Sequence, residues 1–590
     1  MRISKESLTN EWFEFTKELK RRFDGASWIP LRKNWKQGND LPASKVGYWE
    51  DSWAVGSAAF PPESTEQAEK LGWNDLGIGT NPGPYSFRDG QYKRCDEFQY
   101  DDKVTIGTNL VFTQFSAPTD KEVWIINPDL ILALKLVREG NDWISPYDDF
   151  DVVIKETYRD DGKPESIDIK KEYLLDYLSA RNLHLRLSAF RSRVMVVSEL
   201  SEGPYEKPFR IDDNREGARF ELLVRSLEEI YGGTAAVFKV WRTGFDHEVD
   251  APVLDKETDE NTAHESFTKK MESEMGFRIE GEYWREEWVK HNGASERIRG
   301  DAPKTFPLFI TDTSGSTKES SDLNSEDIGS WLWFKPAVIK ELLNHRAFKL
   351  VWYTNETGGM ISSDRSRVHF GLNNSNLIVA YAYDIARLSV WQQKIWAAYN
   401  VVPTGGLGDE LAASQVRSEP ASTYAPEQKL HIVVDECDAA FIKKFGKPCF
   451  KDRPNVHAQL DIISRFSAAD DTSLLTLAKD IYRATVENLD QNALRSISDP
   501  ANGNLGSIKL IEKILEKYVN QKIARNCTQH LVALNELRIG DAHKTSSDLN
   551  EAYSLAGLDR TSNITRQAMQ LIDGVGYTLW LIAETLRRSS

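Results

Sequence analysis

The chain has 590 residues, of which 40% are hydrophobic and 28% charged, and this composition is ordinary for globular protein. Domains usually hold about 100–200 residues, so we expect two to four domains, roughly. The formal net charge of −16 excludes a nucleic-acid-binding surface over the whole chain, because such surfaces depend on clustered Lys and Arg. A local basic site is still compatible with this net charge.

Cysteine use and hydropathy indicate a cytoplasmic protein with no membrane partner. The four cysteines are far apart and form no Cys-x-x-Cys pair, which argues against a zinc knuckle or a disulfide framework. The N-terminus has no apolar core of the kind found in signal peptides. The apolar stretches at 377–386 and 577–583 are shorter than the roughly 20 residues of a membrane span.

Residues 1–205 are predicted to form a mixed α/β domain, because helical and alternating apolar patterns follow one another. A polar stretch with Gly and Pro at 202–216 marks its expected end. The expected helices are 1–25 and 169–182, and the expected strands are 104–115, 122–126, 151–154 and 184–197.

Residues 206–425 are predicted to form a second mixed α/β domain that is rich in tryptophan. The expected strands are 235–241, 306–310 and 348–353, the expected helices are 335–343 and 383–399, and 414–428 is expected to be a linker. Large aromatic side chains fill cores and also line pockets, so either role is possible for a set of tryptophans in this region, together with Arg285. The group comprises Trp284, Trp288, Trp331, Trp333, Trp352 and Trp391.

Residues 455–590 are predicted to form an all-α helical bundle, because every long apolar pattern there has the helical period. The clearest helix spans 564–586, and others are expected at 471–486, 508–523 and around 531–537. The expected fold class is therefore α+β, with two mixed α/β regions followed by an all-α helical-bundle C-terminal domain.

Within the bundle, Arg538 and His543 form an Arg-x4-His motif. We expect Gly540 to break the helix after Leu537, so that His543 lies in a loop and turns toward the same pocket as Arg538. An imidazole can then transfer the proton of an RNA 2′-hydroxyl, and a guanidinium can bind the scissile phosphate. Asp541 would orient the imidazole, and the chemistry requires no metal ion or other cofactor.

This helical C-terminus with its Arg-x4-His motif resembles the HEPN superfamily over residues 455–590. The resemblance implies a metal-independent endoribonuclease with an RNA substrate, a homodimer through the C-terminal helices, and a toxin-like role in abortive defence against phage. Residues 1–425 would sense an unidentified trigger or restrain the nuclease. The chain departs from the family at Ile539, where a polar residue usually follows the arginine.

Other residues offer alternatives for the same chemistry. Arg242/His247, Arg285/His291 and Arg525/His530 have similar spacing, and the last pair is expected inside one continuous helix, where its side chains would diverge. Three lysines spaced by four residues could hold RNA backbone or, beside Glu512 and Glu516, simply form a solvated helix face. They are Lys509, Lys513 and Lys517.

A different class of function is indicated by Asp312-Thr313-Ser314-Gly315-Ser316, which follows an apolar run. It resembles the Asp-x-Ser-x-Ser metal site of von Willebrand factor A domains, which implies a non-enzymatic recognition protein with a metal-dependent adhesion-type module. An ordinary Ser/Gly turn is the other interpretation. Residues 430–436 resemble a strand with a terminal Asp-Glu pair, but no phosphate-binding Gly-x4-Gly-Lys-Ser/Thr loop accompanies them.

Overall fold

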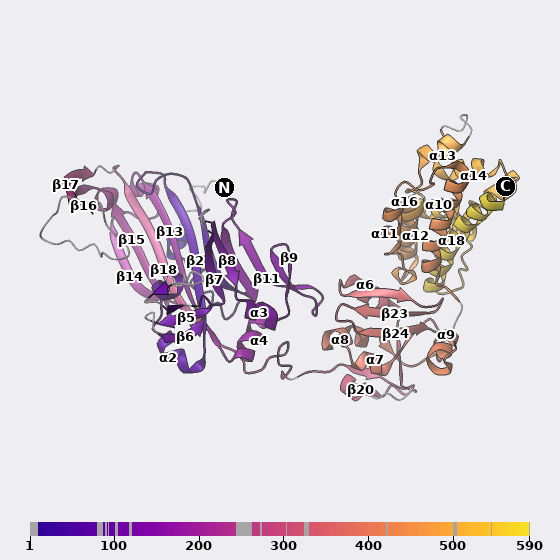
Figure 1. Ribbon diagram of the computed structural model, residues 1–590, viewed down its shortest axis with the longest axis horizontal. Coiled ribbons are helices and arrows are strands. Elements are labelled where there is room, and N and C mark those ends of the chain that lie inside the picture. The colour runs from indigo at the N-terminus through magenta and orange to yellow at the C-terminus, as the bar shows by residue number, and fades with distance from the viewer. Residues whose placement is uncertain are drawn as a thin grey trace. The chain divides into compact units, whose positions relative to one another are not determined.

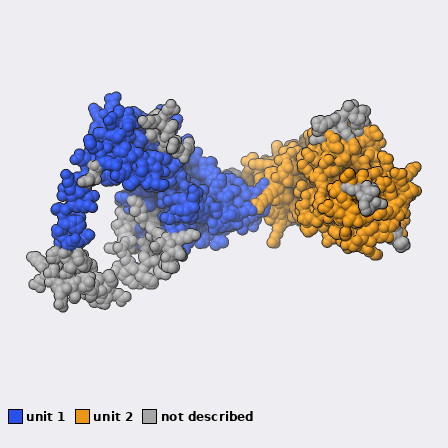
Figure 2. Space-filling view, turned by 90° about the horizontal axis from the view of Figure 1, so that it is seen from above, with its two compact units in different colours: residues 1–303 blue, residues 304–590 orange. Residues whose placement is uncertain are grey.

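The computed structural model describes residues 10–588 apart from 79–86, 89–90, 93, 101–103, 117–120, 243–261, 272–273, 303, 324–329, 420–422, 499–503 and 544–545. The chain divides into two compact units, unit 1 (residues 1–303) and unit 2 (residues 304–590) (Figure 2). Large antiparallel sheets and a mostly helical C-terminal region confirm the expected α+β class (Figure 1). Among the described residues, no helix is long and apolar enough to cross a membrane.

Unit 1 is built on a twelve-stranded antiparallel sheet with the main order β14-β15-β18-β13-β2-β1-β12-β11-β10-β9, while β6 pairs with β2 and β5. The boundary expected at residues 205–206 therefore falls between β13 and β14 of one sheet and separates no domains. The strands are β1 (Trp28–Gly38), β2 (Trp49–Phe60), β5 (Glu97–Tyr100), β6 (Val104–Thr108), β9 (Val137–Glu139), β10 (Asp142–Ser145), β11 (Asp151–Tyr158), β12 (Pro164–Lys170), β13 (His184–Val197), β14 (Phe209–Arg215), β15 (Ala218–Ser226) and β18 (Phe277–Val289).

One face of this sheet is covered by two helices, α3 (Pro128–Ala133) and α4 (Lys171–Arg181), and by the hairpin of β7 (Val111–Ser116) and β8 (Lys121–Ile126). Their buried apolar side chains form one cluster with those of β1, β11, β12 and β13. A second hairpin pairs β16 (Gly233–Arg242) with β17 (Thr262–Met271).

The expected elements of unit 1 are partly confirmed. The strand 184–197 is β13 and the helix 169–182 is α4, whereas the strand expected over 104–115 is two strands. The backbone turns there because Asn109 donates its backbone N–H to Asp96 and its side-chain amide to Cys95. The helix expected over 1–25 is reduced to α1 (Asn10–Glu14), and residues 1–9 lie outside the described part. The segment that follows α1 is not helical. The buried Arg285 guanidinium of β18 donates to two backbone carbonyls of this segment, and these hydrogen bonds hold the segment against the sheet.

Unit 2 begins with a six-stranded antiparallel sheet in the order β22-β23-β24-β25-β21-β26. The expected helix 335–343 and strand 348–353 correspond to α6 and β22, but the helix expected over 383–399 is two helices. The elements are β21 (Trp331–Phe334), α6 (Ala337–Asn344), β22 (Phe348–Trp352), β23 (Thr357–Ser362), β24 (Arg367–Leu372), β25 (Ile378–Tyr381), α7 (Ala382–Ala386), α8 (Val390–Ala398), β26 (Asn400–Val401) and α9 (Asp409–Ala412), after a small hairpin of β19 (Leu308–Ile310) and β20 (Thr317–Glu319).

In the rest of unit 2, residues 426–588, the described elements are helices apart from one isolated β-bridge, and this region is called the helical part below. It begins before residue 455 because residues 430–436 belong to a helix, not to a strand. Leu430, Val434, Cys437 and Phe441 recur on its buried face at helical spacing. The helices are α10 (Pro426–Phe445), α11 (Arg453–Leu460), α12 (Asp471–Thr485), α13 (Gln491–Ile497), α14 (Ser507–Leu515), α15 (Gln521–Asn526), α16 (Gln529–His543), α17 (Ser546–Leu555) and α18 (Ile564–Arg588).

The patterns at 471–486 and 564–586 are confirmed as α12 and α18. Asp470 caps α12 through a reciprocal capping box with Ser473. The single helix expected over 508–523 is α14 and α15, because the Asn520 side chain accepts the N–H of Ile523 and starts a new helix.

Candidate functional site

The Arg-x4-His motif lies on one uninterrupted helix, α16, so the expected break at Gly540 does not occur. A glycine inside a helix costs only about 1 kcal/mol relative to alanine. Leu531, Leu534 and Leu537 are fully buried and anchor the preceding turns. Positions five apart on a helix differ by about 140° in direction and about 7.5 Å along the axis. Positions 538 and 543 of one chain therefore lie on different sides of the helix.

Arg538 is held in a defined position near the C-terminal end of α16. Its guanidinium lies 4.2 Å from the ring centroid of Tyr482, and Nη1 donates to Glu487 Oε1 at 3.1 Å. The side chain is 33% exposed. A guanidinium has five N–H donors, and the contact with Glu487 uses one on Nη1. The side chains of Asp541 and His543, both proposed for the same site, lie outside the described part of the structure.

The alternative pair Arg525/His530 does not share one helix, contrary to the expectation. Arg525 is exposed on α15, and His530 is on α16. The imidazole of His530 faces α18, where Nδ1 lies 3.0 Å from the Thr578 hydroxyl and where the absence of a side chain at Gly574 makes room for the ring. Burial lowers the pKa of His530. The pair combines a solvated arginine with a histidine used in helix packing.

Two of the three evenly spaced lysines are paired within their own helix. Lys509 contacts Glu512 at 2.5 Å and Lys513 contacts Glu516 at 2.6 Å. Lys517 donates instead to the carbonyl of Ile497 at 2.8 Å. Its hydrogen bond goes to a neutral carbonyl and not to a carboxylate, so of the three it is the best suited to bind an anion.

The Asp-x-Ser-x-Ser sequence forms the loop of the β19–β20 hairpin. Asp312 Oδ1 accepts hydrogen bonds from the backbone N–H and hydroxyl of Ser314 and from the backbone N–H of Ser316. The hydrogen bonds from Ser314, followed by those from Ser316, lower the pKa of Asp312 to about 2. Across the described residues, no group of three or more His, Cys, Asp or Glu side chains is placed to hold a metal ion.

The tryptophans proposed as a pocket do not belong to one unit. Trp284 and Trp288 lie on β18 of unit 1, and the other four lie in unit 2. Trp352 is buried at 7% exposure in the core of the six-stranded sheet. Core packing accounts for this residue.

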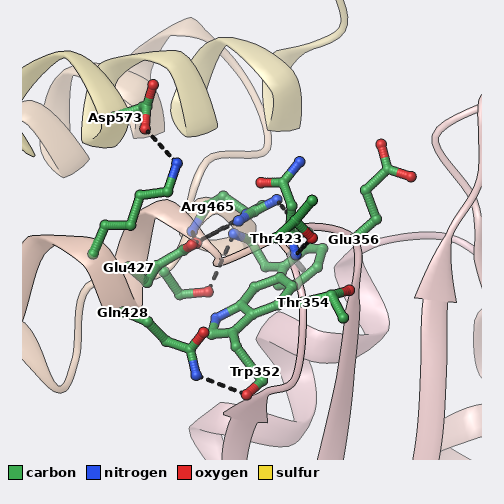
Figure 3. Close-up of polar contacts among 12 residues, drawn as sticks. Trp352, Thr354, Glu356, Thr423, Glu427, Gln428, Arg465 and Asp573 are labelled. Carbon is green, nitrogen blue, oxygen red and sulfur yellow. Dashed lines mark hydrogen bonds and ion pairs between the residues drawn. The ribbon is translucent and has the colours of Figure 1, made fainter. Parts of the chain in front are cut away.

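A buried ion pair within the helical part, which the sequence did not indicate, lies against the six-stranded sheet (Figure 3). Arg465 is fully buried, and its Nε and Nη2 donate to the two carboxylate oxygens of Glu427 at 2.9 and 2.7 Å. Nη1 donates to the carbonyl of Asn355 at 2.9 Å, and the guanidinium lies 4.2 Å from the Trp352 ring. Phe466 stacks on the same tryptophan at 5.6 Å.

Beside this pair, Glu410 of α9 holds the loop after β22. Its carboxylate accepts hydrogen bonds from the hydroxyls of Thr354 and Thr423, both at 2.5 Å, and from the backbone N–H of Glu356 at 2.7 Å. Burial and the nearby carboxylate of Glu410 raise the pKa of Glu356. The network fixes the loop that also supplies the Asn355 carbonyl to Arg465.

Two histidines of α10 and α11 form a second group that the sequence did not indicate. His431 Nδ1 and His457 Nδ1 are 2.8 Å apart, and the ring planes differ by 10°, so the imidazoles meet edge to edge. His457 Nε2 lies 3.0 Å from Asp435, and His431 Nε2 lies 3.6 Å from Asp461. Each ring nitrogen thus faces a partner, and the group connects the two helices. The His-x3-Asp spacing on both helices is the signal that could have revealed it.

Comparison with protein-family models, with curated proteins and with solved structures finds no match to this chain. A function therefore has to be argued from the residues of the chain itself.

Proposed function

We propose that the helical part is a metal-independent endoribonuclease that acts through Arg538 and His543. The observation that carries the proposal is the fixed position of Arg538, held over Tyr482 and beside Glu487 on the helix that also ends with His543. A guanidinium restrained in this way loses little side-chain freedom when it binds a phosphate.

The proposed reaction is attack by the RNA strand's own 2′-hydroxyl. His543 accepts the hydroxyl proton, the 2′-oxygen bonds to phosphorus, and the bond from phosphorus to the 5′-oxygen breaks. Arg538 stabilises the charge that develops on the phosphate oxygens. The leaving 5′-oxygen takes up a proton, and the products are a 2′,3′-cyclic phosphate and a 5′-hydroxyl.

We further propose that two copies of the chain build each site. Because α16 is continuous through Gly540, positions 538 and 543 of one chain lie on different sides of the helix. Contact between two copies through the C-terminal helices α16 and α17 would place Arg538 of one copy beside His543 of the other. A twofold dimer would contain two such sites.

The remaining residues would serve as the sensing or restraining part of a cytoplasmic defence effector, with a trigger that the sequence does not identify. The contacts of Arg465 support such coupling, because its guanidinium binds Glu427 of the first helix and also the Asn355 carbonyl and the Trp352 ring beside the six-stranded sheet. A change in the sheet could thereby reach the helices that carry the motif.

The proposal is tested by cleavage of labelled RNA with the purified full chain. His543→Ala and Arg538→Lys should each lower the rate by about 10²–10⁴-fold, because alanine cannot transfer a proton and an ammonium lacks the two-pronged guanidinium. Arg525→Ala is the matched control, since it removes an exposed arginine from the same bundle, and His530→Ala tests the alternative histidine. Circular dichroism of every variant shows whether the fold is intact.

Mixing the two inactive variants tests the composite site. If each site takes Arg538 from one copy and His543 from the other, random pairing should restore about a quarter of the wild-type activity. Absence of recovery would mean that the two residues act within one chain or not at all. Activity should also survive excess EDTA. Loss in EDTA with rescue by magnesium would contradict the mechanism and make Asp312 the next residue to mutate.

A further inference from the structure

A groove of about 570 Å³ lies between the segment after α14 and the last turns of α18. Lys517 and Tyr518 line one side, and Trp580, Glu584 and Arg588 line the other. The motif on α16 contributes no residue to its lining. The groove is therefore a separate feature of the helical part.

Aromatic rings in this groove keep part of their surface in solvent. Trp580 is 38% exposed and Tyr518 is 36% exposed, although their neighbours Leu579 and Leu515 are buried. Tyr577, one turn earlier on α18, is 52% exposed and stacks on Trp580 with ring centroids 5.8 Å apart. Tyr577 and Trp580 thus extend one aromatic surface along the helix. Nucleic-acid bases stack on such rings whatever their sequence.

The charge around these rings is positive, although the whole chain carries −16. Lys517 donates to a carbonyl, and Lys444, which lies outside the lining, is 4.8 Å from the Tyr518 ring. Arg588 is 77% exposed and contacts the one carboxylate of the lining, Glu584. The lining thus holds two cations, Lys517 and Arg588, against one carboxylate, and this excess of positive charge complements a phosphate backbone.

We infer that this groove binds a single-stranded stretch of RNA, with bases stacked on Trp580 and Tyr518 and phosphates on Lys517 and Arg588. The inference names the docking surface for the substrate of the proposed nuclease and depends on that function for the choice of RNA over other polyanions. It also assigns a role to the lysine series, since Lys517 alone of the three reaches the groove.

The test uses fluorescence anisotropy of a short single-stranded RNA that is 2′-O-methylated throughout, so that cleavage through the 2′-hydroxyl cannot consume it. Trp580→Ala in the full chain should weaken binding by about 5- to 150-fold, the loss of one stacked base. Trp580→Phe keeps a ring and should weaken it less. Lys517→Gln should lower the slope of log affinity against log salt by about 0.7, whereas Lys509→Gln, the matched control already paired with Glu512, should leave it unchanged.

Several outcomes would overturn the inference. They are no binding by the wild-type chain, affinities of Trp580→Ala and Lys517→Gln equal to wild type, or equal effects of Lys517→Gln and Lys509→Gln. Light scattering covers the remaining alternative: if Trp580→Ala converts a dimer to a monomer and RNA affinity is unchanged, the groove is a contact between copies. If the chain binds this RNA through Trp580 but cleaves no RNA, the proposed nuclease activity is contradicted and the proposed RNA-binding groove is not. If Trp580→Ala cleaves RNA and keeps full RNA affinity, only the proposed RNA-binding role of the groove is contradicted.

Discussion

The twelve-stranded sheet of unit 1 and the helical part of unit 2 bury their titratable groups with opposite consequences. On the sheet, Glu282 faces Glu221 across the strand pair β18–β15 and has Glu280 two residues away on the same face. Burial, Glu280 and Glu221 raise its pKa to about 7. In the helical part, burial lowers the pKa of His431 and His530. The sheet therefore favours a protonated carboxyl and the helices favour neutral imidazoles.

The difference follows from how the two structures bring side chains together. Strand register fixes which residues face each other, so three acidic residues on neighbouring positions cannot separate. In the helical part, burial lowers the pKa of these histidines more than the nearby carboxylates raise it, Asp461 and Asp435 at His431 and Asp573 at His530. Protonation of Glu282 on acidification should consequently stabilise its part of the sheet, and protonation of His431 and His530 should destabilise the helical part. Three experiments test this difference between the sheet and the helical part.

The largest effect is expected from Arg465→Ala, which leaves Glu427 as a buried carboxylate without its ion-pair partner. Such a loss costs about 3–5 kcal/mol of unfolding free energy. In unit 1, Arg193→Ala should cost less, because Asp51 keeps its contacts with Arg191 at 3.0–3.1 Å. Urea unfolding gives the two values, with hydrogen exchange to assign each loss to its unit. A greater loss for Arg193→Ala would contradict the idea that multiple partners protect the sheet.

A smaller gain is expected from Glu282→Gln. The pKa of the folded state lies above the ordinary value of 4.5, so the unfolding free energy falls as pH rises from 4.5 to about 7 and stays low above it. At pH 8 the uncharged amide should stabilise the sheet by about 1–3 kcal/mol, and at pH 4 it should change little. Hydrogen exchange of β13 and β18 measures this, with the exposed Glu63→Gln as control. An equal effect at both pH values would show that packing, not charge, is responsible.

The smallest effect concerns His530. Its folded-state pKa lies below the ordinary value of 6.5, so the unfolded state takes up the proton first and the unfolding free energy falls as pH drops below 6.5. Each histidine contributes at most about 1.4 kcal/mol per pH unit. His530→Gln should flatten the pH dependence of hydrogen exchange in α16 and α18. An unchanged pH dependence would show that His530 does not contribute to the pH dependence of stability in the helical part.

The elements that sequence patterns predict well are long and have one clear period. β13 and α18 are of this kind, because their apolar residues alternate or recur over more than ten positions. The start of α10 was misassigned because Ile432, Val433 and Val434 favour a strand locally, while the buried face of the helix emerges only over twenty residues. β17 lies in a polar stretch whose composition gives no strand signal.

For the candidate site, the sequence supplies the motif but not its surroundings. Tyr482 and Glu487, which hold Arg538, are some fifty residues earlier in the chain, and only the packing of α12 against α16 brings them close. At Gly540 the sequence predicts a helix break that does not occur. The local helix-breaking preference of glycine is outweighed by the buried leucines of the same helix. Arg465 lies in a short segment of mixed polar and apolar residues, and its burial depends on partners that are distant in the chain.

The contacts of Arg465 with the six-stranded sheet also imply a delay during synthesis of the chain, because the sheet is made before the residues that cover it. The last strand of the six-stranded sheet ends at Val401, but Arg465 and Phe466, which seal its Trp352 edge, are 64 and 65 residues further on. At about 5–20 residues per second, a ribosome needs some 3–13 s to make that stretch. During this interval the Trp352 edge has neither its cation nor its stacked ring, and we expect it to be the surface on which a chaperone would hold the growing polypeptide.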